Sequence, residues 1–148
     1  MEDRVQYAFG AELVEVRVHA RTREIRVPRI VAAFAAGKIV SPTTAQGQFI
    51  GGLVWGIGSA LLEKTEVEPR SARYVNDNLA DYLIATNADV GEIETIVVPE
   101  EDTQVNALGA KGIGELANTG TAAAIANAVY HATGIRVRHL PIRIEDLI

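Results

Sequence analysis

The sequence predicts one α+β (mixed α/β) domain over residues 1–148, in which hairpin strands accompany two long buried helices. Three observations support this prediction. The chain has 148 residues, which is enough for one hydrophobic core. Alternating valines near the N-terminus are typical of a strand with one solvated face. Two apolar or alanine-rich runs of helical length follow, with further strand-like runs between and after them.

The N-terminal third predicts a β-hairpin. Val14, Val16 and Val18 alternate with polar residues, and residues 20–24 have the composition of a turn. The run over residues 25–36 then loses its polar alternation. Such a run is typical of a strand that is covered on both faces.

The next segment predicts a buried helix. Ser41 is a suitable N-cap and Pro42 fits the first helical position, so the helix should run from there to about Leu62. It is apolar nearly all round, which predicts burial. Its glycines each cost about 1 kcal/mol relative to alanine, so another segment must approach closely. The apolar run over residues 49–62 is shorter than the roughly 20 residues that span a bilayer, so no membrane span is expected.

The remaining elements follow from turn and cap residues. A second hairpin is expected over residues 63–76, a short helix over 77–84 and a strand over 93–100. A long irregular segment over 101–115 precedes a helix from Thr119 or Thr121 to Thr133, with Gly134 at its C-cap. Residues 135–142 are expected to form a closing strand. Long irregular segments in compact domains are usually functional or disordered, and the glycines favour function here.

Composition excludes several classes of protein. Residues 41–130 carry four basic and twelve acidic side chains, so we expect no nucleic-acid partner, which would need a basic stripe. Five arginines between positions 17 and 29 fit a solvated strand face. The chain has no cysteine and its three histidines lack ligand spacing, so we assign no metal ligand. Its charged opening residues have no apolar signal core.

A glycine-rich segment, NALGAKGIGELANTG over residues 106–120, precedes the last helix. It is no Walker loop, because Lys111 comes before the second glycine and no hydroxyl follows. GIGELA fits the GxGxxA dinucleotide fingerprint, although no strand-like run leads into it. A nucleotide-binding module that uses GIGELA therefore stays open as an alternative.

The glutamate of this segment has two interpretations. Backbone N–H groups of Lys111, Gly112, Ile113 and Gly114 can grip an oxygen-rich cofactor, and Glu115 can then act as a base beside it. Alternatively, Glu115 only balances the positive end of the helix dipole. Spacing alone favours the second interpretation.

The stretch LGAKGIGELANTGTAAAIANAVYHATGIRVRHLPI resembles the C-terminal end of the molybdenum-binding subunit of the xanthine dehydrogenase / aldehyde oxidase family. The resemblance extends back through VNDNLADYLIATNADVGEIE and QGQFIGGLVWGIGSALLE to the first hairpin, so it covers nearly the whole chain. It implies part of the C-terminal molybdopterin-binding domain of a molybdenum hydroxylase.

The resemblance also implies a chemistry. The family carries molybdopterin with molybdenum, in bacteria usually as the cytosine dinucleotide. A molybdenum-bound hydroxide attacks an aldehyde or heteroaromatic carbon, and electrons leave through iron–sulfur clusters and often a flavin. By this resemblance Glu115 matches the base and Gln48 the pterin-side glutamine. The cofactor loop matches Lys111, Gly112, Ile113 and Gly114.

This chain departs from the family pattern in two ways. Relatives often have Asp-Val-Gly and Asn-Pro before the glutamine, and Ala36 and Ser41 stand in those places here. The family's subunit is also several times longer. We therefore expect an oxidoreductase part that is active only with the remainder of the molybdenum subunit and with iron–sulfur and flavin subunits. The alternative is a non-catalytic truncated or split-gene remnant.

Two expectations concern the chain by itself. We expect it to self-associate, because a piece of a larger family protein exposes apolar surface. The expected compartment is the cytoplasm, with the periplasm as the alternative for an assembled enzyme of this family.

Overall fold

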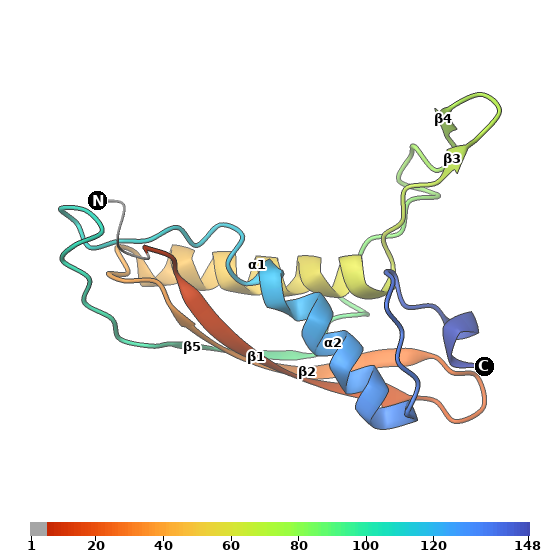
Figure 1. The fold of residues 1–148 in the computed structure, drawn as a ribbon, viewed down its shortest axis with the longest axis horizontal. Helices are drawn as coiled ribbons and strands as arrows, with labels where there is room; N and C mark the ends of the chain where they lie inside the picture. The colour runs from red at the N-terminus through yellow and green to blue at the C-terminus, as the bar shows by residue number, and fades with distance from the viewer. Residues whose placement is uncertain (1–5) are drawn as a thin grey trace.

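A three-stranded sheet forms the base of the fold (Figure 1). The computed structural model describes residues 6–148, so the first five residues of the predicted domain and of its charged opening lie outside the description. The strands are β1 (Phe9–Val18), β2 (Ile25–Ala35) and β5 (Glu92–Val97), in the order β1-β2-β5. β1 and β2 are antiparallel, as the predicted hairpin requires, and β2 and β5 are parallel.

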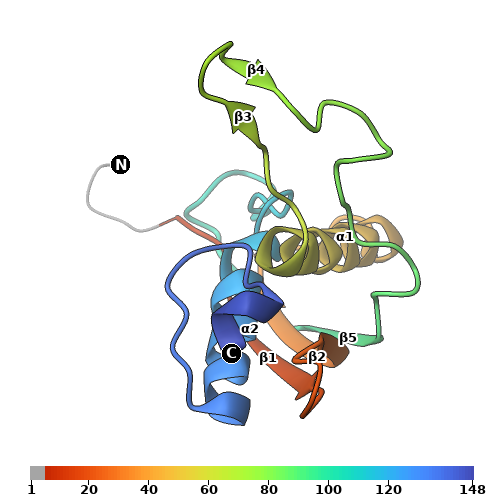
Figure 2. The ribbon, with the colours of Figure 1, turned by 90° about the vertical axis from the view of Figure 1, so that its right-hand side faces the viewer.

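Two helices pack on one face of this sheet (Figures 1 and 2). They are α1 (Pro42–Leu61) and α2 (Asn118–Thr133), and α2 ends at Gly134 in the left-handed conformation, as predicted. The rings of Phe34 on β2 and Phe49 on α1 stack with centroids 4.7 Å apart at the centre of the core. No helix within residues 6–148 is long and apolar enough to cross a membrane.

The outer face of the sheet is not covered. Val31 and Ala33 of β2 are half-buried and Arg29 is exposed on this face, so the predicted coverage of β2 on both faces was wrong. Arg29 pairs there with Glu94 at 3.1 Å, as expected for a solvated charged face. After Arg29 the run is apolar on both faces, and β2 is the central strand, with hydrogen-bonded neighbours on both sides.

The glycines of α1 face two different environments. A Cβ at Gly52 would stand 2.9 Å from the Cβ of Ala117, and one at Gly56 would collide with Thr121. These two glycines let α2 cross α1 closely, which confirms the expected close neighbour. On the opposite side Gly47 and Gly51 have no neighbour within 4 Å. The prediction that α1 is buried all round was therefore wrong for one stripe: Gly47, Gln48, Gly51 and Trp55 are exposed.

The second predicted hairpin is present as a projecting arm beyond the end of α1 (Figure 1). It consists of β3 (Val67–Glu68) and β4 (Arg73–Tyr74). The predicted helix over residues 77–84 is absent, and turns take its place. The reason is local: the side-chain oxygen of Asn78 accepts hydrogen bonds from the N–H groups of Ala80 and Asp81, which competes with helix formation.

The predicted closing strand over residues 135–142 is also absent. The segment instead runs to the C-terminal end of α1, where Ile142 is buried and its N–H donates to the Ala60 carbonyl at 2.7 Å. A short 3-10 helix, η1 (Ile144–Leu147), follows and buries Leu147. Apolar residues that looked like a strand therefore cover the end of a helix.

Candidate functional site

The glycine-rich segment is irregular, as predicted, and is tied to the end of β2. After β5 the chain passes the N-terminal end of α1, and the glycine-rich segment returns beside that helix to α2 (Figure 1). The Lys111 N–H donates to the Ala36 carbonyl at 3.1 Å, and the Lys38 N–H donates to the Gly109 carbonyl at 2.8 Å. Ala36, one of the two departures from the family pattern, thus contributes only its backbone to this contact.

The Lys111 side chain points inward. It is 4% exposed and its ammonium pairs with the carboxylates of Glu100 and, at 3.1 Å, Asp102. The other Glu100 oxygen accepts a hydrogen bond from the Gly37 N–H at 2.7 Å. Both the side chain and the N–H of Lys111 are therefore occupied within the chain, so its place among the cofactor-binding residues stays a prediction.

These contacts keep all three groups of this cluster charged near neutral pH. The hydrogen bond to Glu100 raises the pKa of Lys111 above 10.5. The hydrogen bond from Lys111 lowers the pKa of Glu100, and the Gln104 N–H lowers that of Asp102. The cluster therefore holds one positive and two negative charges, mostly shielded from solvent.

The next three residues are open. Within residues 6–148 the N–H groups of Gly112, Ile113 and Gly114 donate to no acceptor. A Cβ at Gly112 or Gly114 would meet no atom within 4 Å, and neither glycine has a positive φ. Nothing in this chain therefore requires glycine at either position. Open N–H groups on a backbone with glycine at two of three positions fit an oxygen-rich cofactor that approaches closely.

Glu115 carries a free carboxylate. It is exposed in the turn before α2, and its side chain has no hydrogen-bond or ion-pair partner among the described residues. It lies two residues before the N-cap Ala117, and the first turn of α2 contains no acidic residue. Glu115 therefore lies just outside the first turn of α2, and its carboxylate is unpaired within residues 6–148.

A different glutamate serves the start of α2, and sequence reasoning missed it. Glu12 on β1 accepts a hydrogen bond from the Thr121 hydroxyl at 2.6 Å. Burial raises the pKa of Glu12, while the hydrogen bonds of Thr121 and the Gly120 N–H lower it, and burial dominates. The sequence could have indicated this role, because alternate residues of a strand share one face. Glu12 therefore lies on the same inward face as Val14 and Val16.

Gln48 lies near the same helix crossing. It is exposed on α1 one turn before Gly52, and Gly52 contacts Ala117 and Asn118 at the start of α2. The side-chain oxygen of Asn118 is buried and has no hydrogen-bond donor within residues 6–148. The end of the glycine loop thus carries a buried, unpaired amide oxygen at the helix crossing, and Gln48 lies one helical turn away along α1, on its exposed side.

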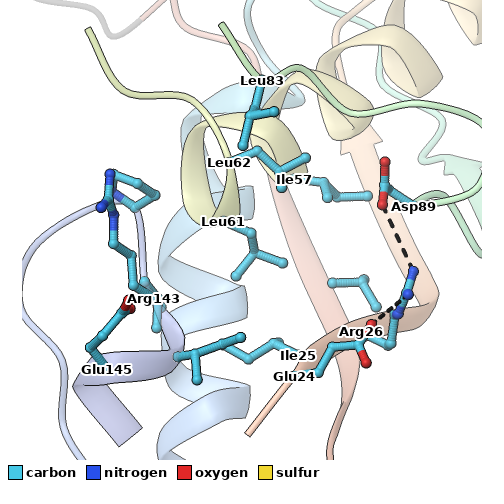
Figure 3. Close-up of a pocket in the computed structure, with 14 residues that line it drawn as sticks. Glu24, Ile25, Arg26, Ile57, Leu61, Leu62, Leu83, Asp89, Arg143 and Glu145 are labelled. Atoms are coloured by element: carbon cyan, nitrogen blue, oxygen red, sulfur yellow. Dashed lines mark ion pairs between the residues drawn. The ribbon is translucent and has the colours of Figure 1, made fainter. Parts of the chain in front are cut away.

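Two pockets among residues 6–148 contain neither Gln48 nor Glu115. A shallow pocket of about 290 Å³ lies beside the loop and includes Lys38, Lys111 and Ile113. Another, of about 420 Å³, lies at the C-terminal end of α1, where Ile57 and Leu61 face the ion pair of Arg26 and Asp89 (Figure 3). The second pocket contains none of the predicted site residues.

Comparison with known proteins bears on this site. Residues 1–91 match the model of the molybdopterin cofactor-binding domain family. The aldehyde oxidoreductase molybdenum-binding subunit PaoC of Escherichia coli (strain K12) is 45% identical over 143 residues, which cover 97% of this chain and 20% of that protein. The xanthine dehydrogenase molybdenum-binding subunit of Escherichia coli O157:H7 is 36% identical over 135 residues, 91% of this chain and 18% of that protein.

A solved structure agrees. The crystal structure of the aldehyde oxidoreductase from Desulfovibrio desulfuricans ATCC 27774 superposes with a TM-score of 0.84 at 33% identity, over 95% of this chain and 15% of that one. The family model ends before the glycine loop, whereas the match to PaoC extends across it. The chain spans about a fifth of the length of the curated relatives it matches. The chain belongs to the molybdopterin cofactor-binding domain family, and its homologues are molybdenum-binding subunits of the aldehyde oxidoreductase and xanthine dehydrogenase type.

Proposed function

We propose that this chain supplies the catalytic base and one cofactor-binding loop of a molybdenum hydroxylase that oxidises an aldehyde or a heteroaromatic ring. The observation that carries the proposal is the free carboxylate of Glu115, which directly follows three open N–H groups. Such an arrangement offers a base at the edge of an anion-binding loop.

Each residue has a proposed role toward the cofactor. The N–H groups of Gly112, Ile113 and Gly114 donate to its oxygen atoms, and the two glycines permit the close approach. Gln48 orients the pterin side through its exposed amide. Glu115 takes up the proton that is released during substrate oxidation, for which an unpaired carboxylate is suited. Molybdopterin with molybdenum, when bound, supplies the oxygen transfer and accepts the electrons of the substrate.

The proposal includes partners. The relatives are about five times longer than this chain, so the rest of the cofactor cavity is proposed to come from the remainder of the molybdenum-binding subunit. We propose the cytosine dinucleotide form of the cofactor, and iron–sulfur and flavin subunits as the route for electrons. The family resemblance supports both assignments.

The first experiment measures molybdenum by mass spectrometry on the chain purified from its native source with bound partners retained. Stoichiometric molybdenum together with a larger partner chain is expected. If neither metal nor partner is present, the chain is a non-catalytic remnant and the proposal fails.

The second experiment replaces Glu115 in that complex. Glu115→Gln should leave molybdenum content and thermal stability unchanged and reduce turnover by about 10²–10⁴-fold, as expected for loss of a general base. Glu101→Gln is the matched control, because Glu101 is an exposed acid of the same segment. Near-normal turnover of Glu115→Gln would remove this residue from the mechanism.

A further inference from the structure

We propose that Lys111 is a positioning residue, whose ion pairs with Glu100 and Asp102 latch the glycine loop to the end of β2 and hold Gly112–Glu115 in their open conformation. This inference rests on the proposed function of the loop. We call the cluster of Lys111, Glu100 and Asp102 the latch.

Glu100 connects the two sides of the latch. One carboxylate oxygen pairs with the Lys111 ammonium, and the other accepts a hydrogen bond from the Gly37 N–H at 2.7 Å, two residues after the end of β2. Asp102 pairs with Lys111 at 3.1 Å through one oxygen. Its other oxygen accepts the N–H groups of Gln104 and Val105, at 2.9 and 3.2 Å. The single ammonium thus orders residues 100–105 as well as the loop.

The backbone closes around the same point. Gly37 and Gly109 both have positive φ, at 63° and 69°, which favours glycine. A Cβ at Gly37 would collide with the Gly109 carbonyl, so the two segments meet at backbone distance. The hydrogen bonds from Lys111 to Ala36 and from Lys38 to Gly109 complete the contact. The latch therefore lies on a close junction that only these glycines allow.

The burial of the Lys111 ammonium indicates that this side chain positions the loop and does not bind the cofactor. A lysine that gripped a cofactor phosphate would direct its charge toward the open side of the loop, but Lys111 is 4% exposed and faces two carboxylates. A shielded ion pair with satisfied hydrogen bonds specifies one geometry, and removal of one partner is strongly destabilising locally. Without Lys111, the carboxylates of Glu100 and Asp102 would repel each other. The segment should then separate from β2 and release Gly112, the next residue.

Hydrogen exchange of the full 148-residue chain tests the latch without any cofactor. In Lys111→Met, exchange of the hydrogen-bonded amides at positions 38, 109 and 111 should rise by about tenfold or more, while amides in the middle of α1 keep wild-type rates. Lys38→Met is the matched control, because its side chain is exposed one residue beyond Gly37, and it should leave the loop unchanged. Unchanged loop exchange in Lys111→Met would overturn the proposal.

A milder variant is needed if Lys111→Met destabilises the whole chain. If Lys111→Met raises exchange in α1 as much as in the loop, Glu100→Gln decides, because it removes one charge and keeps the side-chain shape. A rise confined to the loop in Glu100→Gln supports the latch, and wild-type exchange there overturns it.

The last measurement links the latch to function. In the assembled enzyme, Lys111→Met should lower turnover, and Lys111→Arg should restore part of it because the charge is kept. Suppose that turnover of the complex depends on Glu115 and that Lys111→Met speeds amide exchange in the loop but keeps normal turnover. The latch then does not position the base. If Glu115→Gln retains turnover, the proposed function fails, yet the exchange experiment still decides whether the latch holds the loop.

Discussion

Gly56 of α1 lies directly against Thr121 of α2. A Cβ at Gly56 would stand 2.6 Å from Cγ2 and 2.8 Å from Oγ1 of Thr121. Thr121 is completely buried, and its hydroxyl also contacts the Ala117 carbonyl at 2.7 Å and Glu12 at 2.6 Å. Thr121 therefore connects α1, α2 and β1 at the N-terminal end of α2, directly after the glycine loop.

Substitution of Gly56 should destabilise the chain. The added methyl group of Gly56→Ala has no room beside Thr121, and overpacking of this kind typically costs about 1–3 kcal/mol. Gly51→Ala in the same helix is the matched control, since no atom lies within 4 Å of its Cβ position. It should stabilise the chain by about 0.5–1 kcal/mol through helix propensity. Urea unfolding measures both, and equal effects would contradict the crossing described here.

Glu12 should make stability depend on pH in the direction opposite to most carboxylates. Its folded pKa lies above 4.5, chiefly because of burial, so the folded state binds a proton more tightly than the unfolded state. Its contribution is therefore fully present below pH 4.5 and is lost as pH rises through the folded pKa. Urea unfolding from about pH 4 to 7 should show this decline in the wild type relative to Glu12→Gln. Glu15→Gln, on the outer face of the same strand, should keep the decline; a constant difference between wild type and Glu12→Gln would contradict the assignment.

Titration of Glu100 should report the latch directly. The hydrogen bond from Lys111 is the main cause of its lowered pKa, so its NMR midpoint should lie below 4.5 and rise in Lys111→Met. The carboxylate contribution to the latch is then present above the ordinary carboxyl range and is lost as pH falls through the folded pKa. Glu68 is the internal control. Its pKa is lowered by hydrogen bonds from Arg70 and Ser71 and should not respond to Lys111. Equal midpoints for Glu100 in both proteins would exclude the ion pair in solution.

Self-association stays a prediction and now has a defined surface. On the outer face of the sheet, Phe9 and Leu13 of β1 are 61% and 68% exposed, and Ile96 of β5 is 45% exposed. Light scattering on the purified chain should show more than a monomer, because such contiguous apolar surface rarely stays unpaired. Leu13→Lys should shift the distribution toward monomer, whereas Leu79→Lys, in the turns after β4, should not. A monodisperse wild-type monomer would contradict the prediction.

Local patterns were sufficient for much of the fold. Alternation of valines located β1, Pro42 marked the first residue of α1, and Gly134 marked the end of α2. These features depend on a residue and its near neighbours, so they can be read without tertiary contacts. The glycine-rich motif likewise located the loop and Glu115, because its residues are contiguous in the chain.

Only the tertiary structure decided which charged groups are used within the chain and which stay free. Glu12 and Thr121 are 109 residues apart, and Lys111 turns toward Glu100 and Asp102 because the loop meets the end of β2. The prediction of a strand over residues 135–142 was wrong because its partner also lies far away in the sequence. Its apolar residues pack on the end of α1, and the segment pairs with no strand. Local periodicity measures how apolar a face is, whereas its partner is selected by packing among segments that are distant in sequence.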